Sequence, residues 1–379
     1  MQFLQTFAGL FANFGNLTWQ MVVMWVIGGL LIYLAIAKKM EPSLLLPMGF
    51  GAILVNLPLS GAITQGTTVG PISALFDAGM SNELFPLLLF IGIGAMIDFG
   101  PLLSNPKLFL CGAAAQGGIF LTIMIAAALG FDLKDAASIG IIGAADGPTS
   151  ILVSQTLGSN YIGAIAVAAY SYMALVPIIQ PFAIKLVTTK KDRAMRMPYR
   201  AQGVSKRLRI MFPIVVSVIA GLVAPSSVAL VGFLMFGNLI RECGVLSSLS
   251  QTAQNELANL ITLLLGITIA ASMKADQFVR WETLMIMGLG LVAFILDSMV
   301  GVIFVKILNI FTPKNKINPM VGAAGISAFP MSSRVIEKMG QEADSQNHLL
   351  MHAVAANVSG QIASVVAGGV VLQYFANMG

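Results

Sequence analysis

Ten apolar runs, separated by short polar stretches, constrain this chain more than any other feature of its sequence. One helix needs roughly 20 apolar residues to cross a bilayer, and the shorter runs suit a bundle in which helix ends are buried in protein. Charged residues make up 10% of the chain, whereas soluble domains carry about 25%. We therefore expect an all-α polytopic membrane protein. The runs are Met21–Ala37, Ser43–Leu59, Leu84–Ile97, Leu108–Leu129, Tyr161–Leu186, Ile210–Ala224, Val228–Ile240, Leu257–Ser272, Leu284–Ile307 and Leu349–Phe375.

Two glycine-rich segments between these runs do not fit complete spans. Residues 136–154 contain Asp146-Gly147-Pro148, and a proline removes a backbone donor and clashes with the preceding turn. Residues 318–334 are rich in glycine and serine and contain Pro330. At membrane depth, broken backbone is tolerated only where it is buried in protein or lines a water-filled cavity. We expect both segments to be re-entrant broken helices.

The five runs of the first half resemble the five runs of the second. Such repeats determine the fold, and they predict four parts. These are an N-terminal interfacial helix over 1–20, a first repeat over 21–187 with its re-entrant tip at 136–154, a basic cytoplasmic linker over 188–209, and a second repeat over 210–379 with its tip at 318–334. The matching stretches are Leu44–Pro58 with Ala229–Cys243, Leu87–Phe99 with Leu263–Ala275, and Ile142–Ser154 with Val321–Ser333.

Charge sets the expected orientation. The stretch Lys185–Arg209 carries nine basic residues against one acid, Asp192, and Lys/Arg-rich short loops stay cytoplasmic. Residues 136–154 then enter from outside and residues 318–334 from inside, so the halves have opposite topology. Inverted repeats whose broken helices meet near the midplane are the architecture of secondary transporters. Lys274 and Arg280 are exceptions, because this count places them outside.

Asp146 is the strongest candidate for an ion site. A carboxylate beside backbone carbonyls freed at a helix break supplies the oxygen ligands that Na⁺ prefers, and Thr149 and Ser150 add hydroxyls on the same segment. An ionisable residue inside a membrane segment is a functional hypothesis by default. The alternative is a buried capping aspartate with a structural role only.

The second tip is neutral where the first is acidic. It offers Asn318, Gly322, Ser327 and Arg334, and Ser327 falls on or beside Asp146 when the repeats are aligned. Arg334 is either an anion-facing guanidinium or an arginine that extends to the cytoplasmic rim, as long basic side chains do.

Other polar residues are weaker candidates. Tyr172 follows the first tip, and a buried tyrosine hydroxyl can be a ligand, a proton donor or an interface group. Asn357 and Gln361 are site residues or helix-joining amides, and Asp297 is a minor candidate. His348 and His352 have the spacing of a metal pair, but nothing completes a metal site and interfacial histidines are the simpler interpretation.

Charge and motifs also exclude several functions. The formal net charge of +5 does not indicate nucleic-acid binding, because orientation explains the basic loop. No phosphate-binding loop, serine-nucleophile elbow or dinucleotide fingerprint is present, so ATP bound to this chain does not supply the energy.

Three long motifs resemble the β subunit of the biotin-dependent, sodium-transporting decarboxylases, which include the oxaloacetate, methylmalonyl-CoA and glutaconyl-CoA enzymes. The motifs are GAADGPTSI at 143–151, YSYMALVPIIQP at 170–181 and INPMVGAAGISAFPMSSR at 317–334. The resemblance covers nearly the whole chain. It implies that this subunit, in the cytoplasmic (inner) membrane, takes carboxybiotin from a biotin carrier subunit, releases CO₂, consumes a proton and exports Na⁺.

The resemblance also implies roles for particular residues. The family's functional aspartate and tyrosine match Asp146 and Tyr172, and its second polar cluster matches Asn318, Gly322, Ser327 and Arg334. The catalytic residues expected are Asp146, Tyr172 and Arg334, and Arg334 with Ser327 would contact biotin. The Na⁺ ligands expected are Asp146, Thr149, Ser150, Tyr172, Asn318, Gly322 and Ser327.

Assembly and motion follow from the same resemblance. It implies a carboxyltransferase α subunit, a small membrane γ or δ subunit, a homo-oligomeric arrangement in the complex and an elevator-like movement. The acyl substrate would be chosen by the carboxyltransferase.

Two rival functions stay open on the residues alone. Inverted repeats and broken tips also fit a Na⁺-coupled carboxylate symporter or a Na⁺/H⁺ antiporter. A purely structural membrane anchor leaves the cost of a membrane-embedded Asp146 unexplained. A co-purifying biotinylated partner separates the decarboxylase from the transporters.

Overall fold

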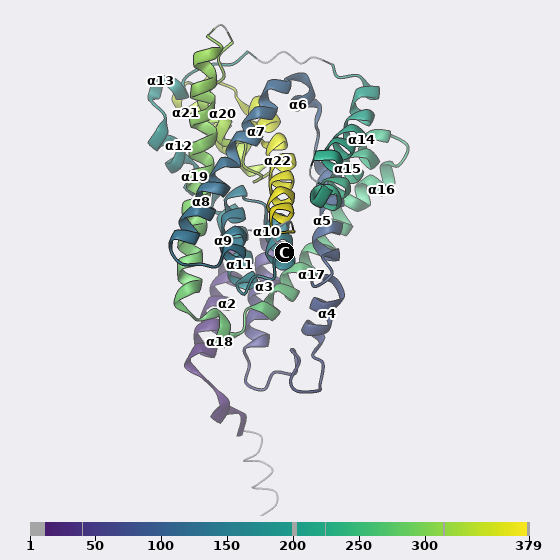
Figure 1. The fold of residues 1–379 in the computed structure, drawn as a ribbon, viewed down its shortest axis with the longest axis vertical. Helices are drawn as coiled ribbons and strands as arrows, with labels where there is room; N and C mark the ends of the chain where they lie inside the picture. Colours follow the sequence, from purple (N-terminus) through teal and green to yellow (C-terminus); the bar gives the residue numbers. More distant parts are fainter. Residues whose placement is uncertain (1–11, 40, 199–202, 224, 314, 377–379) are drawn as a thin grey trace, which may run out of the picture.

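The computed structural model describes residues 12–39, 41–198, 203–223, 225–313 and 315–376, and its secondary structure is helical (Figure 1). Six helical stretches are long and apolar enough to cross a membrane, or up to eight if each of two bent helix pairs is one span. The prediction of an all-α polytopic membrane protein is confirmed. The inverted repeat and the elevator-like movement stay predictions. Of the expected interfacial helix over 1–20, residues 1–11 lie outside the described residues, and Ala12–Asn16 form a short 3₁₀-helix.

The helices of the first half are α2 (Trp19–Ala37), α3 (Pro42–Val55), α4 (Pro71–Gly79), α5 (Leu84–Met96), α6 (Gly100–Ser104), α7 (Phe109–Ala115), α8 (Gly117–Ala128), α9 (Leu133–Gly140), η3 (Ile141–Ala144), α10 (Gly147–Thr156), α11 (Ile162–Ala174), α12 (Val176–Val187) and α13 (Lys190–Arg193). Those of the second half are α14 (Lys206–Val223), η4 (Pro225–Ser227), α15 (Val228–Cys243), α16 (Ser247–Thr252), the π-helical η5 (Ala253–Leu257), α17 (Ala258–Ile269), η6 (Ala270–Ser272), α18 (Ala275–Phe278), α19 (Trp281–Phe311), α20 (Pro319–Ala323), α21 (Met331–Ala343) and α22 (Leu350–Ala376).

Two helix pairs differ from the expected simple spans. The run 161–186 is two helices, α11 and α12, which meet at 76°. Pro177 lies in the first turn of α12, where its missing N–H would have no helical partner. The same proline prevents α11 from continuing into α12 as one straight helix, because its ring clashes with the preceding turn. The stretch 60–83 lies between two of the apolar runs, yet Pro71 opens the amphipathic helix α4 there, and α4 and α5 meet at 64°.

The central helix of the bundle is α22. Of the residues in its most apolar stretch, 83% are buried, against 22% for α2 at the periphery. A helix that is apolar on all sides and buried belongs to the core of a large helical protein, whereas a lipid-facing helix leaves most of its surface uncovered. The polar side chains of α22 between His352 and Ser364 therefore face protein rather than lipid, and Asn357 and Ser364 reach the two broken segments.

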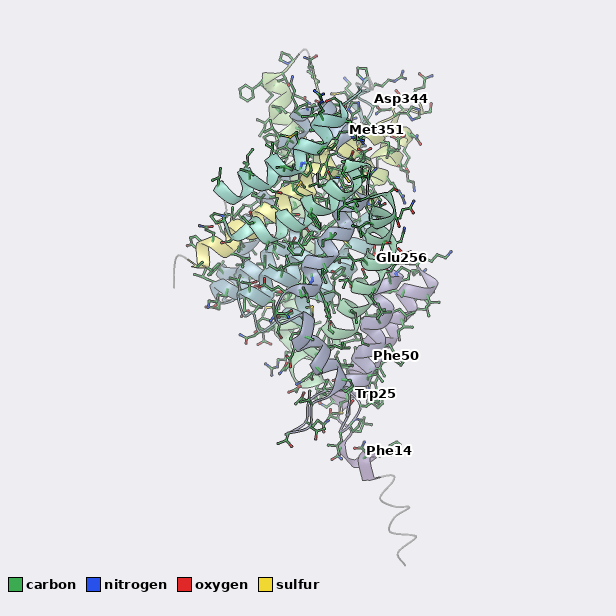
Figure 2. All side chains as sticks on the ribbon, turned by 90° about the vertical axis from the view of Figure 1, so that its right-hand side faces the viewer. Phe14, Trp25, Phe50, Glu256, Asp344 and Met351 are labelled. Atoms are coloured by element: carbon green, nitrogen blue, oxygen red, sulfur yellow. The ribbon has the colours of Figure 1, made fainter. Side chains whose placement is uncertain are left out.

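The two ends of the molecule differ in charge. Helices α13 and α21 lie at one end, while α18 and α4 lie at the other (Figure 1). Figure 2 shows Asp344 and Met351 near the first end, and Phe14 and Trp25 toward the second. The stretch from Lys185 through α13 thus marks what we call the basic end. Lys274 and Arg280, the exceptions to the charge pattern, flank α18 at the opposite end.

Candidate functional site

The first broken segment leaves the helical path where the sequence predicts it. Helix α9 tightens into η3, and Ala145 then adopts a left-handed conformation with φ of 54°. Asp146 is extended, and α10 begins at Gly147 with Pro148 in its first turn. Proline is well suited to that position because its N–H would have no helical partner. The break thus places Asp146 at the N-terminal cap of α10.

The Asp146 carboxylate is buried and accepts three hydrogen bonds. It is 4% exposed. Its Oδ1 accepts the backbone N–H of Thr149 at 3.2 Å, which is the capping contact, and its Oδ2 accepts the Thr149 hydroxyl at 2.8 Å. Oδ2 also accepts the hydroxyl of Ser364, on α22, at 2.8 Å. No basic side chain among the described residues pairs with it.

Ser150 completes the turn without touching that carboxylate. Its hydroxyl donates to the backbone carbonyl of Asp146 at 2.8 Å and lies 3.4 Å from that of Ile141. The Asp146 carbonyl also accepts the backbone N–H of Ser150 at 2.9 Å, the first helical bond of α10, so the Ser150 hydroxyl adds a second contact to it.

The second broken segment is held by side-chain amides. Helix α20 ends at Ala323 and α21 begins at Met331, so the backbone between them leaves carbonyls without helical partners. Asn357, on α22, donates to the carbonyls of Ala324 at 3.2 Å and Ile326 at 2.6 Å. Three glutamines take the carbonyls of neighbouring residues: Gln116 that of Gly325 at 3.2 Å, Gln180 that of Ala323 at 2.8 Å, and Gln361 that of Ser327.

The two broken segments meet. The backbone N–H of Ser327 donates to the carbonyl of Ala144 at 2.8 Å. Ser327 is 2% exposed, and its hydroxyl donates to the Gly360 carbonyl at 2.9 Å. One backbone hydrogen bond thus joins the tips, two residues before Asp146, as the predicted tip-to-tip arrangement requires.

The two tyrosines that follow the first tip, Tyr170 and Tyr172, have different contacts. The Tyr172 hydroxyl donates to the Met287 carbonyl on α19. Tyr170 is the nearer to the aspartate, because its ring packs where a Cβ on Gly147 would lie, 2.2 Å from that point. The Tyr170 hydroxyl is buried without a hydrogen-bond partner among the described residues.

Asn318 and Gly322 lie on α20 and have positioning contacts. The Asn318 amide donates to the carbonyls of Arg193 at 3.1 Å and Met195 at 2.8 Å, and its Oδ1 caps α20 by accepting from Met320. A Cβ on Gly322 would come within 2.1 Å of the Gly301 carbonyl oxygen. Small residues allow such close approach of membrane helices, so Gly322 sets the distance between α20 and α19.

Arg334 lies on the outer side of α21. Its side chain is exposed, and it forms no ion pair among the described residues. It lines a cavity of about 420 Å³ together with Pro177, Pro181, Met331 and Val335. The structure therefore places Arg334 in a cavity at the basic end, without a contact to Asp146.

Asp297 lies against the first broken segment at Gly143, whereas the histidines lie elsewhere. Asp297 is fully buried in α19, and Cβ atoms on Gly118 and Gly143 would lie 1.9 and 2.3 Å from its two carboxylate oxygens. His348 pairs with Glu337 at 3.0 Å, and no group of three His, Cys, Asp or Glu side chains in the described ranges is placed to hold a metal ion.

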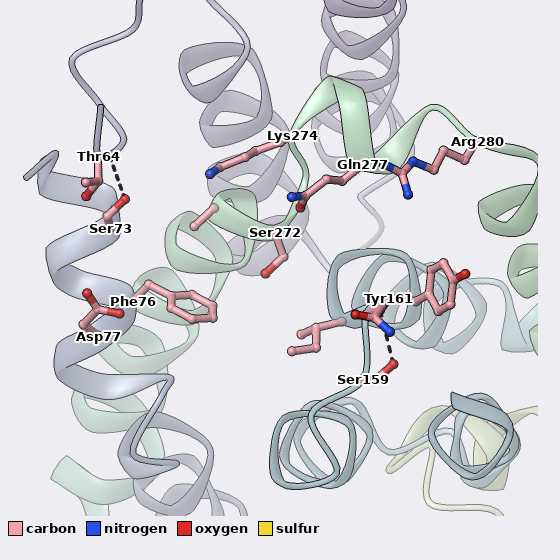
Figure 3. A pocket seen from close by; sticks show the side chains of 13 residues that line it. Thr64, Ser73, Phe76, Asp77, Ser159, Tyr161, Ser272, Lys274, Gln277 and Arg280 are labelled. Carbon is pink, nitrogen blue, oxygen red and sulfur yellow. Dashed lines mark hydrogen bonds between the residues drawn. The ribbon is translucent and has the colours of Figure 1, made fainter. Parts of the chain in front are cut away.

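The end opposite the basic end carries a polar cavity of about 700 Å³ (Figure 3). Lys274, Gln277 and Arg280 reach it from one side, and Asp77 on α4 faces them from another. The third wall is the 159–162 turn between α10 and α11. Asp135 fixes this turn by accepting the Ser159 hydroxyl at 2.7 Å and the Asn160 N–H at 3.2 Å. The cavity thus adjoins the turn that follows α10, the helix that Asp146 caps.

The local sequence pattern does not indicate three residues of this site: Ser364, Gln116 and Gln180. Each is a polar residue in a largely apolar membrane segment, and its partner lies more than 140 positions away in the chain. The only local signal is the burial of a polar group in a membrane helix, which requires a hydrogen-bond partner without indicating which one.

Proteins of similar sequence fit this geometry. A buried carboxylate where two broken helices join is typical of polytopic membrane proteins that transport ions. Residues 20–375 match the family of the Na⁺-transporting oxaloacetate decarboxylase beta subunit. The chain is 47% identical to the methylmalonyl-CoA decarboxylase subunit beta of Propionigenium modestum, over 96% of this chain and 97% of the relative. It is 46% identical to the glutaconyl-CoA decarboxylase subunit beta of Acidaminococcus fermentans (95% and 95%) and 43% identical to the oxaloacetate decarboxylase beta chain of Klebsiella pneumoniae (93% and 94%).

The chain belongs to this family: it is the membrane β subunit of a Na⁺-pumping, biotin-dependent decarboxylase. The resemblance noted from the three motifs is confirmed. Relatives named for three different acyl substrates are similar to the chain at 43–47% identity, so this similarity does not select one substrate.

Proposed function

We propose that this chain decarboxylates carboxybiotin, presented by a biotin carrier subunit at the basic end, and that the reaction drives Na⁺ through the Asp146 site to the opposite face of the cytoplasmic membrane. The main supporting observation is the buried Asp146 carboxylate, which lies where the two broken segments join and has no basic partner within the part of the chain that the structure describes. Burying an anion in a low-dielectric interior is costly unless a cation or proton compensates it.

Na⁺ is the transported substrate, and the oxygens around Asp146 suit it. The hydroxyl oxygens of Thr149 and Ser364 each lie 2.8 Å from Oδ2 of Asp146. Hydroxyls that donate to the carboxylate keep lone pairs that can face a cation. We assign the binding of Na⁺ to Asp146, Thr149 and Ser364, with the tip backbone beside Ser327 as the facing wall.

The remaining predicted ligands have other contacts that suit other roles. Ser150 donates to the Asp146 carbonyl and would stabilise the cap. The Asn318 amide and the Gly322 backbone position α20, so we give them a supporting role in Na⁺ binding.

Carboxybiotin would enter the cavity at Arg334. Its carboxylate is an anion, and Arg334, which forms no ion pair with any described residue, carries a guanidinium suited to bidentate contact with a carboxylate. Pro177, Met331 and Val335 supply apolar surface for the fused ring of biotin. In the reaction the N–CO₂ bond breaks, CO₂ leaves, and the electron pair stays on the ureido nitrogen, which takes one proton.

Tyr172 is our proposed proton donor. Its hydroxyl lies on α11, the helix that joins the Asp146 segment to α12 of the Arg334 cavity in the order of the chain. Tyr170 on the same helix packs against Gly147, whereas the resemblance matches the family's functional tyrosine to Tyr172. A Na⁺ ion arriving at the site would favour the release of that proton, because a nearby cation stabilises a phenolate. This order of events couples Na⁺ binding to protonation of the ureido nitrogen.

Partners and movement complete the proposal. The chain would assemble with a carboxyltransferase α subunit, a biotin carrier and a small membrane γ or δ subunit, as a homo-oligomer within the complex. The two halves would act as inverted repeats, and an elevator-like movement would expose Asp146 to each side in turn.

The test uses the complete complex reconstituted in vesicles. Carboxylated carrier protein should lose CO₂ only when Na⁺ is present, and ²²Na⁺ should accumulate on the far side in step with CO₂ release. A Na⁺-coupled symporter or antiporter is the alternative. The proposal fails if, in vesicles that contain no biotinylated protein, the purified chain carries a carboxylate together with Na⁺ or exchanges protons for Na⁺.

A further inference from the structure

Two cavities at the basic end lie side by side and share part of their lining. The Arg334 cavity shares Lys185, Met339 and Glu342 with a second cavity of about 320 Å³, which extends toward α13 and is also lined by Lys190 and Arg193. We call the two cavities together the basic groove. Its floor is formed by α12 and α21, and its two ends are Arg334 and Lys190.

The basic groove has an excess of positive charge. Five cations line it against one acid, Glu342: Lys185, Lys190, Arg193, Arg334 and Lys338. In the described ranges, none of the five forms an ion pair.

The nearby carboxylates already have other partners. Asp192 pairs with Lys306 at 2.9 Å, Asp344 pairs with Arg196 at 2.6 Å, and Glu337 accepts from His348 and from two backbone N–H groups at the start of α22. The groove therefore presents a net positive field that the chain itself does not neutralise.

The α13 end of the groove is held in place before any partner arrives. The Arg193 guanidinium donates to the carbonyl and the hydroxyl of Thr188, at 2.8 and 3.0 Å. The Arg193 carbonyl accepts from the amides of Asn318 and Asn347, at 3.1 and 2.9 Å. A prearranged surface loses less conformational entropy on binding. Topology alone needs positive charge on this side of the membrane, but it does not need a fixed groove that opens into the Arg334 cavity.

We propose that the α13 end of the basic groove, around Lys190 and Arg193, is the docking surface for an acidic patch on the biotin carrier protein. The inference rests on the proposed function, because it takes the Arg334 cavity as the place where carboxybiotin enters. A carrier that inserts its biotin there must lay its own surface over the adjoining part of the groove. Complementary charge speeds such an encounter and sets its orientation.

The experiment compares two substrates on the same complex: the carboxylated carrier protein and free carboxybiotin. For the wild type, KM for the carrier should rise as the salt concentration increases from low to physiological, because salt screens charges beyond a Debye length of about 8–10 Å. KM for free carboxybiotin should change much less. A carrier KM that does not respond to salt overturns the docking proposal.

Lys190→Glu is the diagnostic variant, because Lys190 is exposed and lies outside the Arg334 cavity. It should raise KM for the carrier roughly tenfold at low salt, leaving kcat and KM for free carboxybiotin unchanged. The matched control is the pair Lys107→Glu and Lys316→Glu, two exposed cations that line a different cavity near the same end. The control should leave the carrier KM near its wild-type value.

Each remaining outcome also decides the matter. Equal effects of Lys190→Glu on both substrates, or an equal effect of the control pair, overturn the docking surface but leave the proposed function standing. An effect of Lys190→Glu that appears only in vesicles containing anionic lipid identifies the occupant as a lipid headgroup and overturns the inference. If the wild-type complex decarboxylates neither substrate, the proposed function itself fails.

Discussion

The two broken segments solve the same backbone problem in different ways. At the first, a charged cap forms: the Asp146 carboxylate accepts from Thr149 and Ser364, and its backbone carbonyl accepts from both the N–H and the hydroxyl of Ser150. At the second, no charge is present between α20 and α21, and amides from three other parts of the chain occupy the exposed carbonyls. A carboxylate leaves an unbalanced charge for a mobile cation, whereas the carbonyls of the second segment are neutral and already accept hydrogen bonds. The first segment is suited to binding an ion, and the second is suited to holding the first in position.

Asp146→Asn tests this contrast most directly and should have the largest effect. The amide keeps the size of the side chain but removes the charge that a cation needs. Na⁺-dependent decarboxylation and ²²Na⁺ uptake by reconstituted vesicles should fall by more than the roughly 10–100-fold that the loss of a supporting partner costs. Because the fold around the cap is retained, the melting temperature should stay close to that of the wild type. Substantial Na⁺ uptake by this variant would remove Asp146 from the transport site.

Ser364→Ala probes the one contact that reaches Asp146 from α22. It removes a hydroxyl 2.8 Å from Oδ2 while leaving the charge in place, so the apparent Na⁺ affinity should weaken by roughly 10–100-fold. The maximal rate at saturating Na⁺ should change little. Na⁺-activation curves of CO₂ release check this, and Ser359→Ala, elsewhere on α22, serves as the control. A loss of maximal rate without a change in affinity would indicate a packing role instead.

How far the sequence predicts this site depends on the distance between partners. The break at Gly147-Pro148 and the cap at Asp146 follow from local chemistry, and both are present. Ser364 lies 218 residues from Asp146, and a serine in an apolar helix carries no sign of its partner. The sequence also does not show which side of α11 faces which neighbouring helix. Tyr170 and Tyr172 are two residues apart and so face different neighbours. Only the packing shows that Tyr170 lies beside Gly147 and that Tyr172 reaches α19.

Asn357→Val tests the positioning role of the second segment. It removes the two hydrogen bonds to the carbonyls of Ala324 and Ile326. Hydrogen bonds between membrane helices contribute about 0.6 kcal/mol on average and up to about 1.7, so the loss should be about 1–3 kcal/mol of stability. Thermal or denaturant unfolding in detergent measures it. The apparent Na⁺ affinity of the folded fraction should stay within about twofold, and a much larger shift would make this segment part of the ion site.

The smallest expected effect concerns an attachment of the second segment at the basic end. Asp344 follows α21, and Arg196 from the basic linker donates to it at 2.6 Å. The Arg196 hydrogen bond is the main cause that lowers the pKa of the Asp344 carboxyl below its usual range. A depressed carboxyl pKa contributes stability above the unfolded pKa of about 3.9, and that stability disappears as the pH falls through the folded value. Arg196→Gln should therefore lower the melting temperature slightly at pH 6, by less than Asn357→Val does, because Arg196 is 56% exposed and exposed pairs contribute little. The two melting temperatures should converge well below pH 4. A difference that persists in acid would show that Arg196 acts through its hydrogen bond to Gln346, which does not titrate, rather than through Asp344.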